Sequence, residues 1–403
     1  MNDTRHQVAI VGGGMVGAAL ALLLAQRARV PAASILLLEP EPAQPLPADA
    51  AYELRVSAIS PGNRRLLQEI GAWQCMNLSR VASYERMTVW FESTPPDSPD
   101  VLRFDAAEMG EPDLGSIVEN RNLQAALLAR CAASGITQMR SRVTSLQITP
   151  DGALLGLEGQ GIEVELVVGA DGANSAVRKL LGIGETQRPY GERAIVANVA
   201  SERGHQDTAW QRFLATGPLA LLPLANGQSS IVWSAQDAEA ARLMDLPAAQ
   251  FSAALTEASA GVLGQLTLTS ARAAYPLRRM WANRFAGNRC ALVGDAAHVI
   301  HPLAGQGVNE GLHDALSLAG ALAGRPARES IGAGRPLLAY ARERRSGNAV
   351  TGTMMDALDA LFTGSGPVTR MAATAGMSLV ARLPQARRFF FTRAATSRSS
   401  PRR

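Results

Sequence analysis

The stretch from Val8 to Gly17 reads VAIVGGGMVG, and it decides the fold of the chain. Its first four residues are apolar and mostly β-branched, which is typical of a strand buried in a parallel sheet. Three glycines follow at the spacing Gly12-x-Gly14-x-x-Gly17. A tight turn and the close approach of a phosphate both need residues without a Cβ, and the third glycine lets a helix pack closely on the strand. We therefore expect the pyrophosphate of a dinucleotide to lie over this turn, at the N-terminus of a helix.

A second buried strand is expected at residues 34–39, after an Ala/Leu-rich helix at residues 15–29. It ends in Glu39, 22 residues after Gly17. A carboxylate at this place accepts hydrogen bonds from ribose hydroxyls and repels a 2′-phosphate. The strand, the helix and the acid together favour a dinucleotide site over an ordinary glycine turn, but they do not separate NAD from FAD.

The composition indicates a globular protein. Of the 403 residues, 47% are hydrophobic and 18% are charged, which suits one large domain or two joined domains. The net charge of +4 is too small to indicate a nucleic-acid partner. The three cysteines lack metal-ligand spacing and suggest a reducing compartment. No uncharged apolar run reaches about 18 residues and no secretory signal is visible, so we expect a cytoplasmic protein without a transmembrane helix or a metal.

Two further glycine–aspartate turns follow buried strands. The first is GADGANS at residues 169–175, and the second is GDAAH at residues 294–298, followed by HPLAGQGVN at residues 301–309. With the turn at residues 12–17, these motifs stand in the order of the aromatic-hydroxylase group of flavoprotein monooxygenases. Within that group the chain resembles the ubiquinone-biosynthesis hydroxylases, over essentially its whole length up to the C-terminal tail.

The resemblance implies that FAD is the cofactor. Asp295 matches the group that holds the ribityl chain, and the loop from Pro302 to Gly307 would bring backbone N–H groups to the edge of the flavin ring. The helix from Val308 points its positive end there, which stabilises negative charge on a reduced flavin. The motif of Asp171 would serve both FAD and the nicotinamide nucleotide. The expected cofactor contacts are Gly12, Gly14, Met15, Val16, Gly17, Glu39, Arg55, Arg121, Gln124, Asp171, Gly172, Gly294, Asp295, Pro302, Gly305, Gly307, Val308 and Asn309.

Several of these residues also have a purely structural interpretation. Arg55 and Arg121 would fit surface ion pairs. Asp171 would fit a cap on the helix that begins near Ser175, and Asp295 would fit a simple N-cap. The two kinds of role can coexist, and both stay open at this point.

No catalytic residue is assigned by the sequence. The flavin-edge loop, with Pro302, Gly305, Gln306 and Gly307, is the nearest candidate. His298 and His301 are weaker candidates for acid–base groups, because a histidine in a tight loop is more often structural. The chain departs from the family at Glu310, where relatives usually carry an apolar residue after Asn309. An acid in the first turn of a helix suits the helix dipole, but it leaves the electrostatics of the flavin site open.

The expected architecture is an α/β fold in which a Rossmann-like FAD-binding domain is interleaved with a β-sheet substrate domain. The FAD-binding domain is expected at residues 1–83, 105–182 and 277–330, the substrate sheet at 84–104 and 183–276, a C-terminal helical region at 331–391 and a disordered tail at 392–403. Residues 161–169 are expected as one buried strand. A single helical insert is expected near residues 247–260.

The resemblance implies a cycle in which NADPH or NADH reduces FAD, O2 adds at the flavin C4a, and a hydroxyl group passes to an activated phenol ring. The segment at residues 159–161 lies in an expected hairpin without a following helix, so the reductant has no nucleotide domain of its own. The motifs LRVSAI at residues 54–59 and IVEN at residues 117–120 look most like the C5 hydroxylase of polyprenylphenol. Another ring position of a ubiquinone precursor stays open.

Three other functions are alternatives to ring hydroxylation. A same-fold halogenase needs an active-site lysine, but the only lysine, Lys179, lies beside Arg178 in the nucleotide motif. A prenyl reductase fits the motifs, because reduced flavin also delivers hydride. A non-catalytic flavin-binding scaffold within a ubiquinone-biosynthesis complex is the third alternative.

A polyprenyl substrate requires contact with a membrane or with a partner that delivers it. The segment from Leu379 to Arg393 is apolar and basic, as an interfacial segment should be, although Pro384 breaks a simple helix. We expect peripheral contact with the inner face of the cytoplasmic membrane. Packing of this segment on its own domain, or on another subunit of a homo-oligomer, fits equally well.

Overall fold

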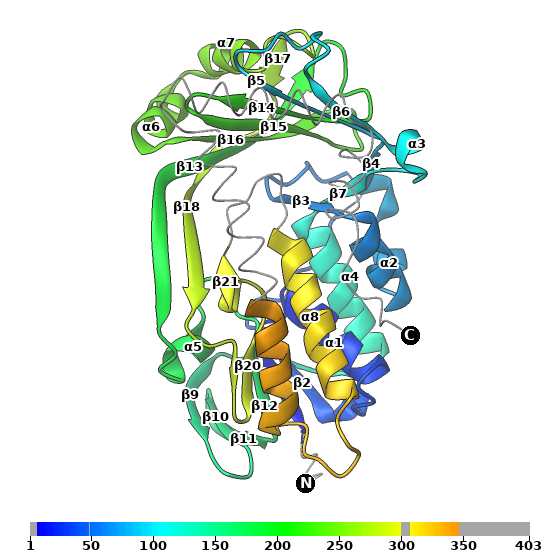
Figure 1. The fold of residues 1–403 in the computed structure, drawn as a ribbon, viewed down its shortest axis with the longest axis vertical. Helices are drawn as coiled ribbons and strands as arrows, with labels where there is room; N and C mark the ends of the chain where they lie inside the picture. Colours follow the sequence, from blue (N-terminus) through cyan, green and yellow to red (C-terminus); the bar gives the residue numbers. More distant parts are fainter. Residues whose placement is uncertain (1–5, 48, 300–306, 346–403) are drawn as a thin grey trace.

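The computed structural model describes residues 6–47, 49–299 and 307–345 (Figure 1). A six-stranded sheet forms the lower half of the molecule in that view, in the order β19-β20-β12-β1-β2-β8. The strands from β20 to β8 are parallel, and β19 is an antiparallel edge. The bounds of its strands are Val8–Val11 for β1, Ile35–Leu38 for β2, Thr137–Met139 for β8, Leu166–Gly169 for β12, Ala286–Gly287 for β19 and Cys290–Leu292 for β20.

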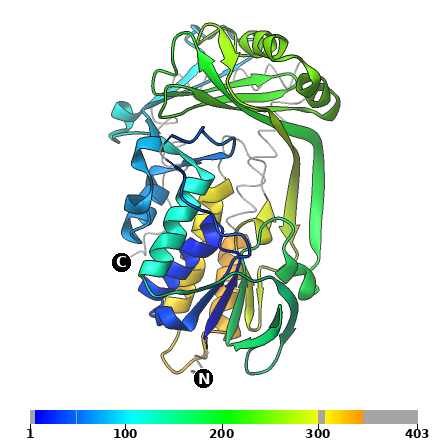
Figure 2. The ribbon, with the colours of Figure 1, turned by 180° about the vertical axis from the view of Figure 1, so that it is seen from behind.

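Helices cover this sheet on one side. Helix α1 packs between its neighbours α4 and α8, and this is why its apolar residues point all round (Figure 2). A further helix at residues 334–345 lies beside α8. The bounds are Met15–Gln26 for α1, Asn120–Ala133 for α4 and Gly307–Ala323 for α8. The buried faces of these helices and the six strands form one hydrophobic core.

A nine-stranded sheet forms the upper half, in the order β21-β18-β13-β16-β15-β14-β5-β6, with β17 paired to β13. Helices α6 and α7 cover its outer face and build a second core with it. The bounds are Arg86–Phe91 for β5, Leu102–Asp105 for β6, Glu185–Ser201 for β13, Thr208–Leu214 for β14, Gly217–Pro223 for β15, Ser229–Gln236 for β16, Asp237–Asp245 for α6, Ala248–Ala258 for α7, Leu266–Leu268 for β17, Ala273–Ala282 for β18 and His298–Val299 for β21.

Two small sheets complete the described part. The first, β3-β7-β4, lies between the two halves, and the second, β11-β10-β9, flanks the six-stranded sheet. The remaining bounds are Ala32–Ser34 for η1, Val56–Ile59 for β3, Pro61–Glu69 for α2, Trp73–Cys75 for η2, Leu78–Arg80 for η3, Ala82–Tyr84 for β4, Ala106–Met109 for α3, Gly115–Glu119 for β7, Val143–Ile148 for β9, Ala153–Leu157 for β10, Gln160–Val164 for β11, Ala176–Leu180 for α5 and Gly294–Ala296 for η4.

The α/β fold expected from the sequence is confirmed, with two corrections. The single strand expected at residues 161–169 is wrong: β11 ends at Val164 in a hairpin with β10, and β12 then pairs in parallel with β1. The single helical insert near residues 247–260 is also wrong, because α6 precedes α7. Pro247 separates them, since proline lacks the N–H that would continue α6. The boundary proposed at residue 276 falls inside β18, which runs from one half of the molecule to the other (Figure 1).

Candidate functional site

The glycine turn after β1 is held in a conformation that only glycine adopts easily. Gly12 has a φ of +108°, and a Cβ there would overlap the carbonyl oxygen of Ala170 in the neighbouring turn. A Cβ on Gly17 would overlap the carbonyl oxygen of Gly12. These two glycines therefore serve the packing of strand and helix, as their spacing predicts.

Gly14 differs from the other two glycines because a Cβ there would meet none of the described protein atoms within 4 Å. It is the N-cap of α1, and because glycine has no side chain, the residue at this position does not cap the free N–H groups of that helix. Met15 and Val16 follow directly in the first turn. Uncapped N–H groups beside open space suit an anion, because they carry the positive end of the helix dipole. The turn thus fits a pyrophosphate.

Glu39 lies at the end of β2 and contacts the same turn. Its Oε2 accepts a hydrogen bond from Gly13 N at 2.8 Å, and its Oε1 accepts one from Glu41 N at 3.0 Å. Gln124, on α4, donates from Nε2 to Gly13 O at 3.1 Å. Both backbone groups of Gly13 are therefore fixed by side chains from other elements, and the half-buried carboxylate of Glu39 is oriented beside the turn.

Arg121 and Arg55 lie on the border between the two halves. Arg121 donates from Nε to Gln44 O at 2.9 Å and lies 3.4 Å from Glu53 Oε1, so the structural interpretation of this residue holds as far as its protein contacts go. The exposed guanidinium of Arg55 lies 6.0 Å from the centre of the Tyr275 ring, which belongs to the nine-stranded sheet. Arg55 thus faces the gap between the sheet and the cofactor turn.

Asp171 follows β12, at the carboxyl end of the parallel sheet. Its Oδ2 accepts a hydrogen bond from Val177 N at 3.1 Å, and Ser175 Oγ accepts one from Arg178 N at 3.0 Å, so both residues cap α5. The other oxygen, Asp171 Oδ1, is buried without a hydrogen-bond partner among the described residues. A buried acceptor is rarely left unsatisfied, so this oxygen suits a donor group of a ligand or a water. Gly172, beside it, has a φ of +79°.

The turn after β20 lies next to the turn after β1. Gly294 has a φ of +59°, and the side chain of Val16 packs against both Gly294 and Gly311 of α8. Asp295 follows directly in the same turn. Loss of solvent among the surrounding protein atoms raises the pKa of Asp295, and the charges of His298 and Arg55 act in the opposite direction. The three motifs of the sequence therefore meet at one edge of the sheet, where a single dinucleotide can reach them all.

His298 is buried, with 3% of its surface exposed. Its Nε2 lies 2.7 Å from Asp314 Oδ2, and the ring packs against the aromatic rings of Trp281 and Phe285, each centred 5.7 Å away. These contacts favour a structural role over acid–base catalysis. His301, together with Pro302, Gly305 and Gln306, lies outside the described residues, so their expected roles stay predictions.

The start of α8 is anchored by Asn309. Its Oδ1 accepts hydrogen bonds from Ser60 N at 3.1 Å and from Asn63 Nδ2 at 2.8 Å, and its Nδ2 donates to Ala58 O at 2.7 Å. The side chain thus ties α8 to β3 and α2. Gly307 is exposed and Val308 is half-buried at the beginning of the helix.

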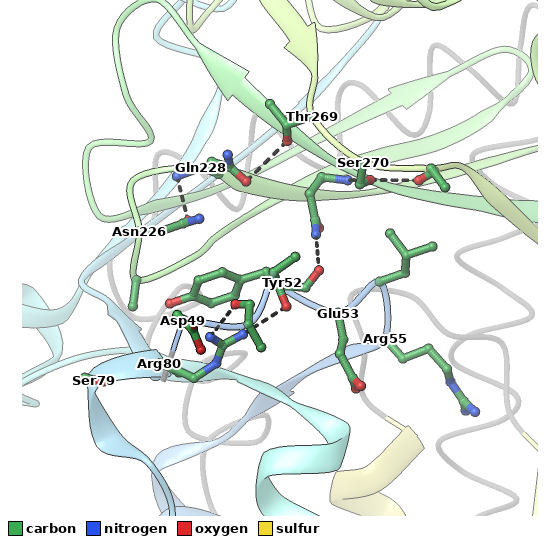
Figure 3. Close-up of a pocket in the computed structure, with 16 residues that line it drawn as sticks. Asp49, Tyr52, Glu53, Arg55, Ser79, Arg80, Asn226, Gln228, Thr269 and Ser270 are labelled. Carbon is green, nitrogen blue, oxygen red and sulfur yellow. Dashed lines mark hydrogen bonds between the residues drawn. The ribbon is translucent and has the colours of Figure 1, made fainter. Parts of the chain in front are cut away.

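A pocket of about 970 Å³ separates the loop at residues 49–55 from the nine-stranded sheet (Figure 3). The Tyr52 ring lies in it, with the Arg80 guanidinium 4.3 Å from the ring centre. Arg80 is buried and donates two hydrogen bonds to the carboxylate of Glu119, of 2.7 and 2.8 Å. Its Nη1 also donates a hydrogen bond to Ala50 O at 2.8 Å. The sheet side is polar and carries Asn198, Asn226, Gln228, Thr269 and Ser270.

The role of Arg80 and Glu119 was missed in the sequence. Asn198 Nδ2 also donates to Tyr52 O at 2.9 Å, so the loop that carries Arg55 is held from both halves of the molecule. The only available signal was Glu119 itself, an acid directly after the apolar run of β7. Its partner lies 39 residues away in the chain, so no local pattern links the two.

Among the described residues, no helix has the length and apolar character needed to cross a membrane. The same residues contain no group of three or more His, Cys, Asp or Glu side chains arranged for a metal ion.

Solved structures share the fold. The p-nitrophenol 4-monooxygenase PnpA from Pseudomonas putida DLL-E4 matches with a TM-score of 0.76 over 98% of this chain and 99% of that chain, at 18% sequence identity. HpxO from Klebsiella pneumoniae, solved with FAD and uric acid, matches with a TM-score of 0.71 over 96% of each chain, also at 18% identity. At these identities the likeness concerns the fold alone.

Relatives found by sequence share a higher identity with this chain than these two solved structures do. The chain is 36% identical over 381 residues to the 3-demethoxyubiquinol 3-hydroxylase of Escherichia coli, which covers 94% of this chain and 95% of the relative. It is 36% identical over 397 residues to the ubiquinone hydroxylase UbiL of Rhodospirillum rubrum, over 97% and 90% of the two chains. The human mitochondrial ubiquinone biosynthesis monooxygenase COQ6 is 33% identical over 93% of this chain and 89% of its own.

A family model described as the FAD binding domain matches residues 5–351. That match spans the turns at Gly12, Asp171 and Asp295, which the structure brings to one edge of the sheet. The chain belongs to this FAD binding domain family and, within it, to the ubiquinone-biosynthesis hydroxylases, which are FAD-dependent aromatic-ring monooxygenases.

Proposed function

We propose that this protein hydroxylates the aromatic ring of a polyprenylphenol intermediate in ubiquinone biosynthesis, with NADPH or NADH as transient reductant and O2 as co-substrate. The observation that carries the proposal is the 36% identity, over 94% of the chain, to a relative named for hydroxylating demethoxyubiquinol. Bound FAD supplies the oxygen-transfer chemistry. The protein supplies binding, orientation and electrostatics.

Residues in and beside the three turns bind different parts of the cofactor. The N–H groups at Gly14 and in the first turn of α1 bind the pyrophosphate, and Glu39 binds the adjacent ribose. Asp295 holds the ribityl chain. Asp171 Oδ1 accepts a hydrogen bond from the nucleotide, and its buried, unpartnered state supports this role. Arg55, at the border of the two halves, contacts the flavin end.

The ring of the substrate occupies the space between the loop at residues 49–55 and the nine-stranded sheet. A volume of about 970 Å³ is ample for a substituted phenol. Asn226 and Thr269 offer hydrogen-bonding groups there, which suit the oxygen substituents of a ring better than an isoprenoid tail. Hydroxylation at C5 stays a prediction, because the Escherichia coli relative is named for position 3 of its own substrate.

The test is turnover of a short-chain prenylphenol by the FAD-loaded protein, with NADPH and NADH tried separately. Oxygen uptake and product mass are followed together, and NMR of the product gives the ring position. A gain of one oxygen atom on the ring supports the proposal. Saturation of a prenyl double bond would identify a reductase instead, and no turnover despite tightly bound FAD would favour the scaffold.

We propose separately that the protein reaches its substrate at a membrane surface. Transfer of apolar carbon out of a bilayer costs about 0.8 kcal/mol per CH2, so a long prenyl tail stays in the membrane. We place the protein peripherally at the inner face of the cytoplasmic membrane. The segment from Leu379 to Arg393, which would make the contact, lies outside the described residues. If a chain ending at Gly376 binds liposomes and turns over substrate as well as the full chain does, this proposal is wrong.

A further inference from the structure

Four charged or titratable side chains form a connected buried group beside the turn that carries Asp295. We call it the Asp314 network, and its members are His298, Glu310, Asp314 and Arg344. Arg344 Nε donates to Asp314 Oδ1 at 2.5 Å, and Arg344 Nη2 donates to Glu310 Oε2 at 2.8 Å. Asp314 Oδ2 accepts from Gly294 N at 2.8 Å and lies 2.7 Å from His298 Nε2. The network joins α8, β21 and the Gly294 turn to the helix at residues 334–345.

Arg344 supplies the charge that this group needs. Asp314 is fully buried and Glu310 is mostly buried, so two carboxylates lie close together away from solvent. Burial by itself raises the pKa of each, but His298 and Arg344 lower the pKa of Asp314, and His313 and Arg344 lower that of Glu310 to about 2. Removal of one partner from a buried charge network leaves an uncompensated charge, which is strongly destabilising.

The network reaches the cofactor site through backbone groups. Gly294, which donates to Asp314, directly precedes Asp295 and has a φ of +59°. The carboxylate of Asp314 therefore fixes the direction in which the Asp295 backbone leaves the turn. Val16, in the first turn of α1, packs against the same glycine, so a shift of Gly294 would also disturb the pyrophosphate turn.

The network also neutralises a negative charge at the beginning of α8. The N-terminus of a helix carries roughly half a positive charge, and an unpaired acid in the first turn would cancel it. Glu310 is such an acid, but its carboxylate is paired with Arg344. The guanidinium of Arg344 thus lets the end of α8 stay positive although the chain has an acid where relatives usually have an apolar residue.

We propose that Arg344 is a positioning residue of the FAD site, which holds the Gly294–Asp295 turn through Asp314 and cancels the charge of Glu310 at the start of α8. The helix at residues 334–345 is then a functional part of the cofactor site. The inference requires FAD at the turn of residues 12–17, but it does not depend on which phenol is hydroxylated or on the ring position.

The experiment compares Arg344→Met, Arg344→Lys and Glu310→Gln with wild type, by FAD dissociation constant and by the two-electron midpoint potential of bound flavin. Arg344→Met should weaken FAD binding at least tenfold and lower the potential by at least about 30 mV, which is a tenfold preference for oxidised flavin. Arg344→Lys keeps the charge, so its potential should stay closer to that of wild type. Glu310→Gln should raise the potential, because it removes a negative charge.

The exposed Arg342, on the same helix, provides the matched control. Arg342→Met should leave both measurements at the wild-type values. If Arg344→Met fails to fold, Glu310→Gln and Arg344→Lys still decide the electrostatic claim. Wild-type affinity and potential in Arg344→Met would overturn the proposal, and so would an unchanged potential in Glu310→Gln. A failure of substrate turnover with these cofactor effects intact would concern the proposed substrate only.

Discussion

A methyl group at Gly311 would overlap the side chain of Val16, so the beginning of α8 packs on the first turn of α1 only because residue 311 is glycine. We expect Gly311→Ala to lower the free energy of unfolding of the FAD-free protein by about 1–3 kcal/mol, as overpacking does in other cores. Val16→Ala in the same chain should restore part of this loss. Guanidinium unfolding of the single and double variants measures both effects.

Gly320 is the control for that prediction, because it lies on an exposed part of the same helix, and none of the described atoms lies within 4 Å of an added Cβ. Gly320→Ala should raise the free energy of unfolding by up to about 1 kcal/mol through helix propensity. Equal effects of the two substitutions would contradict the packing of α8 on Val16.

The three glycines of the cofactor turn should respond differently to alanine. The new methyl group of Gly14→Ala meets no atom in the described part of the chain, so the FAD-free protein should keep its fold. The new methyl group occupies the space expected for the pyrophosphate, so FAD affinity should fall at least about tenfold, or about 1.4 kcal/mol. Gly12→Ala, with a φ of +108° and a clash with Ala170, should instead give little folded protein.

Titration of the FAD-free Gly14→Ala protein with FAD, followed by flavin fluorescence, measures the affinity. Circular dichroism checks that the variant is folded. Wild-type affinity in a folded Gly14→Ala protein would show that the pyrophosphate does not lie over this turn.

Arg80 should contribute more to stability than an exposed arginine of similar geometry. Arg80→Met leaves the buried Glu119 without its partner, and we expect a loss of about 3–5 kcal/mol in the free energy of unfolding. Arg27, which pairs with Glu69 at the surface, is the control, and Arg27→Met should cost about 1 kcal/mol or less. Urea unfolding of both variants makes the comparison, and similar losses would mean that the Arg80–Glu119 pair is no more important than a surface pair.

The pH dependence of stability should report on Glu310. Burial opposes its ionisation, but His313 and Arg344 lower its pKa from 4.5 to about 2. A carboxyl whose pKa is lower in the folded state stabilises the protein above its unfolded pKa, and this contribution is lost as the pH falls from 4.5 towards 2. Between about pH 5 and about pH 3, the wild-type protein should therefore lose about 2 kcal/mol more than Glu310→Gln.

Denaturant unfolding at the two pH values gives this difference. The exposed Glu158, in the turn between β10 and β11, is the control. Glu158→Gln should follow the wild-type curve. If the Glu310→Gln curve also runs parallel to that of wild type, the carboxylate is not held by His313 and Arg344 in the folded protein.

The parts of the fold that follow from local rules were predictable from the sequence. The strand, turn and helix at residues 8–26 were among them, because apolar periodicity and glycine spacing act within a few residues. The meeting of the turns at Asp171 and Asp295 was expected from the family order, and parallel strands end at the same edge of a sheet. Glu39 was expected beside the turn, but its bond to Gly13 was not, because that contact depends on how β2 lies against β1.

The tertiary pairings could not be predicted. Residues 161–169 look like one strand by hydrophobicity, yet β11 and β12 pair with different sheets, and only the positions of β10 and β1 determine this. Arg344 lies 30 residues from Asp314, and Arg80 lies 39 residues from Glu119. The one signal was Asp314 itself, an acid in the middle of an apolar helix, which requires a buried partner of opposite charge.

We expect this protein to transfer one atom of O2 to a phenol ring. Incubation of the FAD-loaded protein with a short-chain prenylphenol, NADPH or NADH, and ¹⁸O2 tests it most directly, with the product analysed by mass spectrometry. We predict that each product molecule carries one ¹⁸O atom on its ring, and that the label is absent when ¹⁸O is supplied as water. A product without ¹⁸O from O2, or a product that has only gained hydrogen, would contradict the account.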